Sequence, residues 1–114
     1  MHLKVINQND KYIQLALSGR LDMAGVREIE IEFAGHAAES GRSIILDMAE
    51  VPFLASMGVR MLLTGAKKLH GGGNGRLILV NPCEMVGDVL RMAGVEALLT
   101  HADTVADAVD ELEK

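Results

Sequence analysis

Ser43-Ile44-Ile45-Leu46-Asp47-Met48 is an apolar run without alternation, and Leu77-Ile78-Leu79-Val80 is a second. Such runs are typical of central strands that are covered on both faces. Between them, apolar residues recur at helical spacing over residues 56–70, with the polar side chains on the opposite face. A strand, a helix and a strand in this order predict two parallel strands joined by a right-handed crossover.

Two further strands are predicted before this unit. Residues 2–7 and 11–18 are joined by a polar turn. In the second of them, Ile13, Leu15 and Leu17 alternate with their neighbours, which is the period of a half-buried antiparallel strand. The chain is therefore expected to begin with a pair of strands.

The next stretch, residues 23–40, allows two interpretations. Residues 28–33 alternate as a strand would, but the stretch is too long for a strand. Its apolar residues also fall on one helical face: Val26, Ile29, Phe33 and Ala37. We therefore predict a helix, with Asp22 placed to cap its start and Gly41 its end.

After the second apolar run, Asn81-Pro82-Cys83-Glu84 has the chemistry of a helix start. Asn81 is predicted to be the N-cap, Pro82 the first helical residue and Glu84 the second half of a capping box. Gly94 is expected to end this helix.

A short strand near residues 97–100 and a helix over residues 103–113 complete the predicted elements. Together they give an α/β fold, a mixed sheet of about four or five strands with about four helices packed against it. At 114 residues, the chain is expected to form a single domain over residues 1–114.

Composition excludes several classes of protein. Hydrophobic residues make up 49% of the chain and charged residues 24%, which excludes a disordered chain. Aromatic residues are only 3% and the net charge is -5, so we expect no direct nucleic-acid binding. A lone Cys83 allows no internal disulfide, and no apolar run approaches the ~18 residues of a membrane span. Without a leader segment, the expected location is cytoplasmic, with no membrane partner.

Residues that could carry chemistry are few. Residues 71–75 are rich in glycine but follow a helix and precede a strand, the reverse of a phosphate loop, so a flexible turn is predicted. Cys83, near a helix start, could be a reactive thiol or a small core residue. Four histidines stand apart without ligand spacing: His2, His36, His70 and His101. No serine, histidine and acid form a catalytic grouping, so we expect no enzyme, no metal and no cofactor.

Ser56 stands at the head of the central helix. As an N-cap, its hydroxyl would accept a hydrogen bond from a backbone N–H group of the first turn. The same N–H groups and the helix dipole would tolerate a phosphate on that oxygen. Gly58 would leave room for another protein to approach closely. The residues alone leave both interpretations open, a plain cap and a modifiable site.

Three groups of residues indicate a family. They are Gly19-Arg20-Leu21-Asp22, then residues 45–48 with 51–59, and finally residues 77–82 with the helix that follows. In this combination the chain resembles the STAS domain family, best known for bacterial anti-sigma factor antagonists. The resemblance covers nearly the whole chain and implies a STAS fold.

The resemblance also implies a function. In that family, a serine or threonine at the position of Ser56 is phosphorylated by a partner kinase that is itself the anti-sigma factor. Ser56 is therefore the expected phosphoacceptor of an anti-sigma factor antagonist, a phosphorylation-switched interaction domain that regulates transcription. The unphosphorylated form would bind the anti-sigma factor, the phosphorylated form would release it, and a phosphatase would reset it.

The implied partner-binding residues surround Ser56, mainly within residues 53–60: Asp22, Phe53, Leu54, Ala55, Met57, Gly58 and Arg60. Asp22 and Asp47 match acidic positions beside the site in the family. The sequence departs from the family pattern at Ala55, where an aspartate is usual, and at Met57, where a small serine or threonine often stands.

Two other classes of function stay open. One is a constitutive STAS interaction module, in a signalling complex or associated with a transporter, in which Ser56 is only a helix N-cap. The other is a nucleotide-binding or small enzymatic domain that uses the same helix start; the missing phosphate loop and acid–base pair argue against it.

Overall fold

In the computed structural model, which describes residues 1–39, 42–95 and 97–113, five strands form one mixed sheet in the order β1-β2-β3-β4-β5. Their bounds are β1 (His2–Gln8), β2 (Tyr12–Ser18), β3 (Ser43–Glu50), β4 (Leu77–Val80) and β5 (Thr100–Ala102). β1 pairs with β2 antiparallel, and each later neighbour is parallel to the one before. The predicted parallel pairing of the two apolar runs is therefore confirmed.

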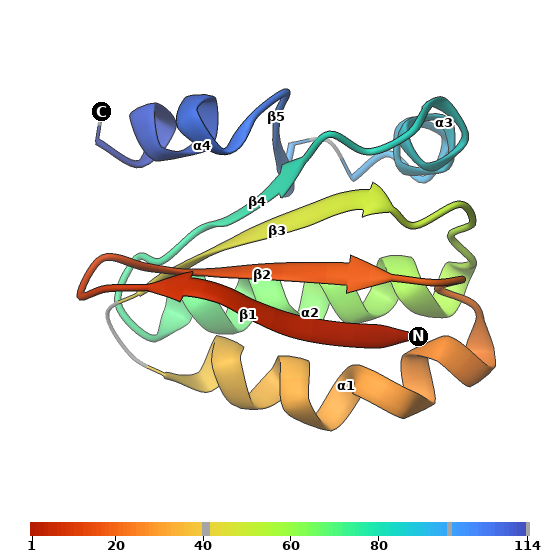
Figure 1. Ribbon diagram of the computed structural model, residues 1–114, viewed down its shortest axis with the longest axis horizontal. Coiled ribbons are helices and arrows are strands. Elements are labelled where there is room, and N and C mark those ends of the chain that lie inside the picture. Colours follow the sequence, from red (N-terminus) through yellow and green to blue (C-terminus); the bar gives the residue numbers. More distant parts are fainter. Residues whose placement is uncertain (40–41, 96, 114) are drawn as a thin grey trace.

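Four helices over the same described ranges cover the sheet (Figure 1): α1 (Met23–Ala38), α2 (Ser56–Gly71), α3 (Glu84–Met92) and α4 (Val105–Leu112). α1 and α2 lie side by side and share one hydrophobic core with the buried residues of α3. α4 packs against a second, smaller core. None of these helices is long and apolar enough to cross a membrane.

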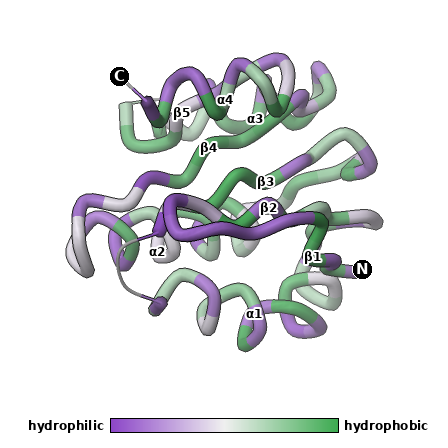
Figure 2. The backbone as a smooth tube through the Cα atoms, turned by 60° about the vertical axis from the view of Figure 1, so that its left-hand side comes forward, coloured by the Kyte–Doolittle hydropathy of each residue, from purple (hydrophilic) through white to green (hydrophobic). Residues whose placement is uncertain are grey.

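The two cores lie on opposite faces of the sheet because side chains alternate along a strand. Leu46 and Met48 of β3 belong to the core under α1 and α2, whereas Ile45 and Ile78 belong to the core under α4. This explains why the central runs do not alternate between apolar and polar residues. Figure 2 shows β3 and β4 in green between the helices.

The predicted α/β class, the mixed sheet and the helices after β2 and β3 are confirmed. Asp22 caps α1 as expected, because its Oδ1 accepts a hydrogen bond of 2.9 Å from the Gly25 N–H. The helix ends at Ala38, with Glu39 as its C-cap. Gly41, the predicted end, lies outside the described residues.

The predicted start of the third helix is wrong. α3 begins at Glu84 with Cys83 as its N-cap, and no side chain caps it. Asn81 has a φ of 52° and its N–H donates to the Ala102 carbonyl, 2.9 Å away, so its backbone serves β5 and not α3. The last strand likewise lies at Thr100–Ala102, beside β4, and not at 97–100.

Candidate functional site

Two loops meet at the edge of the sheet where the parallel strands end. One follows β2 and the other follows β3. The Leu21 N–H donates to the Phe53 carbonyl at 2.9 Å, and the Ala55 N–H donates to the Leu21 carbonyl at 3.0 Å. Leu21 and Leu54 also form a parallel bridge. Asp22 and the start of α2 are thus held beside each other by main-chain hydrogen bonds.

The helix α2 starts one residue earlier than a Ser56 cap would require, at Ser56 itself and not at Met57. Ala55 has extended backbone angles, φ -98° and ψ 171°, and is the N-cap, so Ser56 is the first helical residue. The Ala55 carbonyl accepts the first helical hydrogen bonds, from Gly58 and Val59. The prediction that Ser56 is the N-cap is therefore wrong. Its side chain is exposed, and no side chain caps α2.

Gly58 has a role inside the molecule. It is buried, and a Cβ at this position would lie 2.6 Å from Leu54 Cδ1 and 3.0 Å from the Leu21 carbonyl oxygen. The missing side chain therefore lets α2 pack on the two joined loops. We expected the missing side chain of Gly58 to leave room for a partner protein. In the structure, that space is filled by Leu54 and Leu21 of the same chain.

The predicted partner-binding residues divide into two groups. Leu54 is 2% exposed and Gly58 is buried, so both lie beneath the surface and support the backbone of the exposed residues. The others reach the surface at least in part, together with Ser56: Asp22, Phe53, Ala55, Met57 and Arg60. We call these six residues the Ser56 surface. Arg60 lies four residues after Ser56 and therefore on the same side of α2.

Arg20 also belongs to this region, although the sequence placed it only in the family motif at residues 19–22 and did not predict it as a site residue. Its guanidinium carbon lies 4.2 Å from the centre of the Phe53 ring, and its Nε lies 3.4 Å from Asp22 Oδ2. Arg20 thus connects the loop before α1 to the loop before α2. Because Arg20 stands two residues before Asp22, the sequence could have indicated the contact between these two residues. Nothing in the sequence indicates that Arg20 lies over Phe53.

The surroundings of Asp22 favour the charged form of its carboxyl group. The hydrogen bond from the Gly25 N–H, assisted by Arg20, lowers the pKa of the Asp22 carboxyl below its ordinary value. The site therefore keeps a negative charge at the start of α1, where the helix dipole also favours it.

Asp47, the other acidic position, does not face the start of α2. Its neighbours Leu46 and Met48 point into the core under α1 and α2, so alternation turns Asp47 toward the opposite face. Its Oδ1 accepts a hydrogen bond of 2.9 Å from the Ala49 N–H. Of the two aspartates that match acidic positions of the family, Asp22 alone is therefore joined to the start of α2 through the connected loops.

The remaining candidates have structural positions. Cys83 is half-buried at the start of α3, with its Sγ 3.5 Å from the Val51 carbonyl oxygen. The glycine-rich stretch turns from α2 into β4, and Asn74 there has a φ of 65°. Over the described ranges, no three histidine, cysteine, aspartate or glutamate side chains gather as a metal site would require.

A model of the STAS domain matches residues 4–108. The chain belongs to the STAS domain family. Its sequence is 25% identical over 95 residues to BtrV, a predicted anti-sigma factor antagonist of Bordetella bronchiseptica, covering 83% of this chain and 81% of BtrV.

Solved structures share the STAS fold. The anti-sigma factor antagonist SpoIIAA in its unphosphorylated form superposes with a TM-score of 0.80 at 22% identity, covering 98% of this chain and 96% of SpoIIAA. The phosphorylated form from Bacillus gives 0.69 at 22% identity, covering 97% and 99%. The mouse anion transporter Slc26a9 gives 0.79 at 19% identity, covering 94% of this chain but 18% of the transporter.

Proposed function

We propose that this chain is an anti-sigma factor antagonist, a cytoplasmic, non-catalytic domain that binds an anti-sigma factor through the Ser56 surface. The observation that carries the proposal is the position of Ser56. Its hydroxyl is exposed at the head of α2, and the main-chain bonds between the two loops fix the backbone around it. The family and the likeness to BtrV support an anti-sigma factor as the partner.

The finer step of the proposal is that Ser56 is the phosphoacceptor. A phosphate adds a charge of about -1.5 to -2. At the first helical residue, the free N–H groups and the dipole of α2 would accommodate this charge, so the domain stays folded. In a partner contact the same charge is costly, and a loss of ~3 kcal/mol weakens binding more than 100-fold. The partner would then be a serine kinase, and a phosphatase would restore binding.

The test combines phosphorylation and binding. Incubation with a candidate anti-sigma factor that has serine kinase activity, and ATP, is expected to add one phosphate, and Ser56→Ala is expected to stay unmodified. Ser56→Asp should weaken binding to that kinase about 100-fold, because its charge stands in the contact. Ala106→Asp is the matched control, since Ala106 is also exposed but lies on α4, which packs on the opposite face of the sheet from α2. Unchanged affinity of Ser56→Asp would contradict the switch.

A second function is a constitutive STAS interaction module, and two residues favour it. Ala55 and Met57 flank Ser56 where the family pattern has an aspartate and often a small hydroxyl residue. Ser56 would then be an ordinary first residue of α2, not a cap. Binding of the partner without any mass increase on incubation with the kinase would support this module over the switch.

A further inference from the structure

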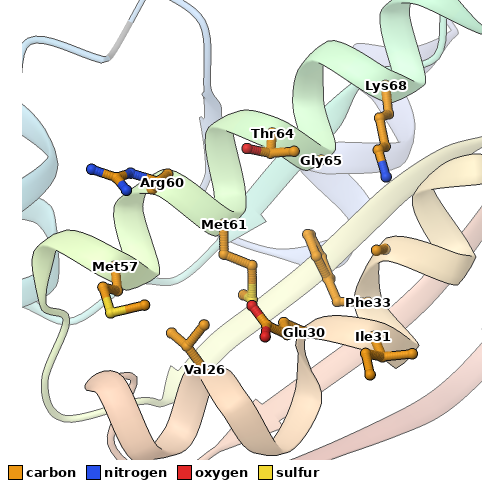
Figure 3. Close-up of a pocket in the computed structure, with 11 residues that line it drawn as sticks. Val26, Glu30, Ile31, Phe33, Met57, Arg60, Met61, Thr64, Gly65 and Lys68 are labelled. Carbon is orange, nitrogen blue, oxygen red and sulfur yellow. The ribbon is translucent and has the colours of Figure 1, made fainter.

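A groove of about 330 Å³ runs between α1 and α2, beginning beside the Ser56 surface. Val26, Phe33 and Met61 form its buried apolar side (Figure 3). The Phe33 ring lies against Gly65, where a Cβ would come within 2.5 Å of the ring. This close fit holds the two helices at a fixed separation, so the groove is part of the folded structure.

Ile31 lines this groove, yet its side chain is 84% exposed. It does not belong to the face by which α1 packs on the sheet. Three small residues share its side of α1, at spacings of four or seven residues, and all are exposed: Ala24, Gly35 and Ala38. A Cβ on Gly35 would meet nothing within 4 Å. Arg27 and Glu28, four and three residues before Ile31, stand on the same side of α1, so the exposed apolar surface of this helix is confined to Ile31 and the small residues around it.

The two helices that border the groove differ in charge. α1 contains three glutamates and one arginine, whereas α2 contains Arg60, Lys67 and Lys68 and no acidic residue. Glu30 and Lys68 line the groove from opposite sides, and Lys68 extends from α2 toward α1 (Figure 3). Within the described part of the chain, neither Glu30 nor Lys68 forms an ion pair. The face is thus acidic along one helix and basic along the other.

We propose that this face docks a second copy of the same chain across a twofold axis. Ile31 of each copy enters the groove of the other, and α1 of each copy lies over the basic helix α2 of its partner. In a twofold dimer, each contact between the copies occurs twice. The acidic helix of each copy can therefore face the basic helix of the other, so this face is complementary to itself. An aliphatic side chain would fit the apolar side of the groove, and an acidic helix would complement the basic helix α2. The helix α1, which carries Ile31, has both properties.

The size of the face sets the expected strength. α1 has 16 residues and is about 24 Å long, and neighbouring helices lie about 8–10 Å apart. Such a face buries on the order of 1,000 Å² in a dimer, near the lower limit of specific interfaces. The dimer should therefore be weak and dependent on concentration. Met57 and Arg60 border the groove as well, so, given the proposed function, self-association and partner binding would exclude each other.

Sedimentation equilibrium of the full chain tests the proposal. Between about 10 μM and 1 mM, the weight-average mass should rise from monomer toward dimer, as expected for a weak complex. Ile31→Glu should weaken association at least tenfold. Met92→Glu is the matched control, because Met92 is 88% exposed but lies on α3, and it should change nothing. This experiment uses the chain alone, so its failure leaves the role of Ser56 untouched.

A charge exchange tests the orientation of the two copies. Glu30→Lys and Lys68→Glu should each weaken the dimer, and together they should restore it. Circular dichroism confirms that each variant is folded. A chain that stays monomeric throughout, or a dimer that Ile31→Glu leaves intact, overturns the proposal. So does a monomer whose groove residues respond in NMR spectra to an added acidic amphipathic peptide, since the occupant would then be another protein.

Discussion

Ala55 occupies the N-cap position of α2, and its methyl group cannot accept a hydrogen bond. The first N–H groups of the helix therefore have no side chain that satisfies them. The family pattern places an aspartate at this position, which would supply a carboxylate to the same N–H groups. The departure at Ala55 thus has a direct physical consequence for the helix, separate from any role in recognition by a kinase.

Ala55→Asp is expected to stabilise the protein by about 1 kcal/mol and to raise the melting temperature by a few degrees. Thermal unfolding followed by circular dichroism measures the change. Thr104→Ala is the control in the opposite direction, because the Thr104 hydroxyl accepts a bond from the Asp107 N–H at the start of α4. An unchanged melting temperature for Ala55→Asp would show that the first turn of α2 gains nothing from a cap.

Asp22 predicts a dependence of stability on pH. Because its pKa is lowered in the folded protein, its charge contributes stability that is fully present above the ordinary pKa of about 3.9. This contribution is lost as the pH falls through the lowered folded-state pKa. NMR titration should therefore find an Asp22 pKa below that of an unfolded aspartate. The stability difference between the protein and Asp22→Asn should shrink in acid; a difference independent of pH would contradict this assignment.

At the scale of elements, Gly58 decides how closely α2 packs on the two loops. Gly58→Ala is expected to destabilise the protein by about 1–3 kcal/mol, because the new methyl group would meet Leu54 and Leu21. Gly87 in α3 is the matched control, since a Cβ there meets nothing within 4 Å. Gly87→Ala should therefore stabilise the protein by up to about 1 kcal/mol. Urea unfolding compares the two, and equal effects would contradict the proposed contact.

The periodicity of the sequence was enough to predict the elements but not their ends. α1 and α2 follow from apolar residues at helical spacing, and β3 and β4 from unbroken apolar runs. Ala55 and Cys83 are N-caps without capping side chains, so composition gives no sign of them. Asn81 has the chemistry of a cap, but the hydrogen bond of its backbone to Ala102 takes it away from the helix. Such a contact between distant residues has no local signal.

The candidate site could be predicted only in part, because several of its contacts also join residues that are distant in the chain. Ser56 could be placed at the head of a helix, because strand and helix patterns adjoin there. The burial of Leu54 and Gly58 depends on the bridge to Leu21, more than thirty residues away in the chain. Arg20 over Phe53 and the groove beside Ile31 also arise from loops and helices that meet only in the folded molecule.

At the scale of the whole molecule, one sheet separates two cores of unequal size. β3 and β4 contribute side chains to both cores, so neither core is expected to survive the loss of the other. We therefore predict that residues 1–114 unfold as a single cooperative domain. Circular dichroism reports on all helices, whereas Tyr12 fluorescence reports on the smaller core. The two urea transitions should coincide, and separate midpoints would indicate two independent units.

The connection between the loops before α1 and α2 has a consequence for how such domains diversify. Its hydrogen bonds join main-chain atoms of Leu21, Phe53 and Ala55, so they do not depend on which side chains the surface displays. Surface residues around Ser56 can therefore be exchanged while the backbone that presents them stays in place. A lineage built on this arrangement can acquire new partners without first evolving a new shape.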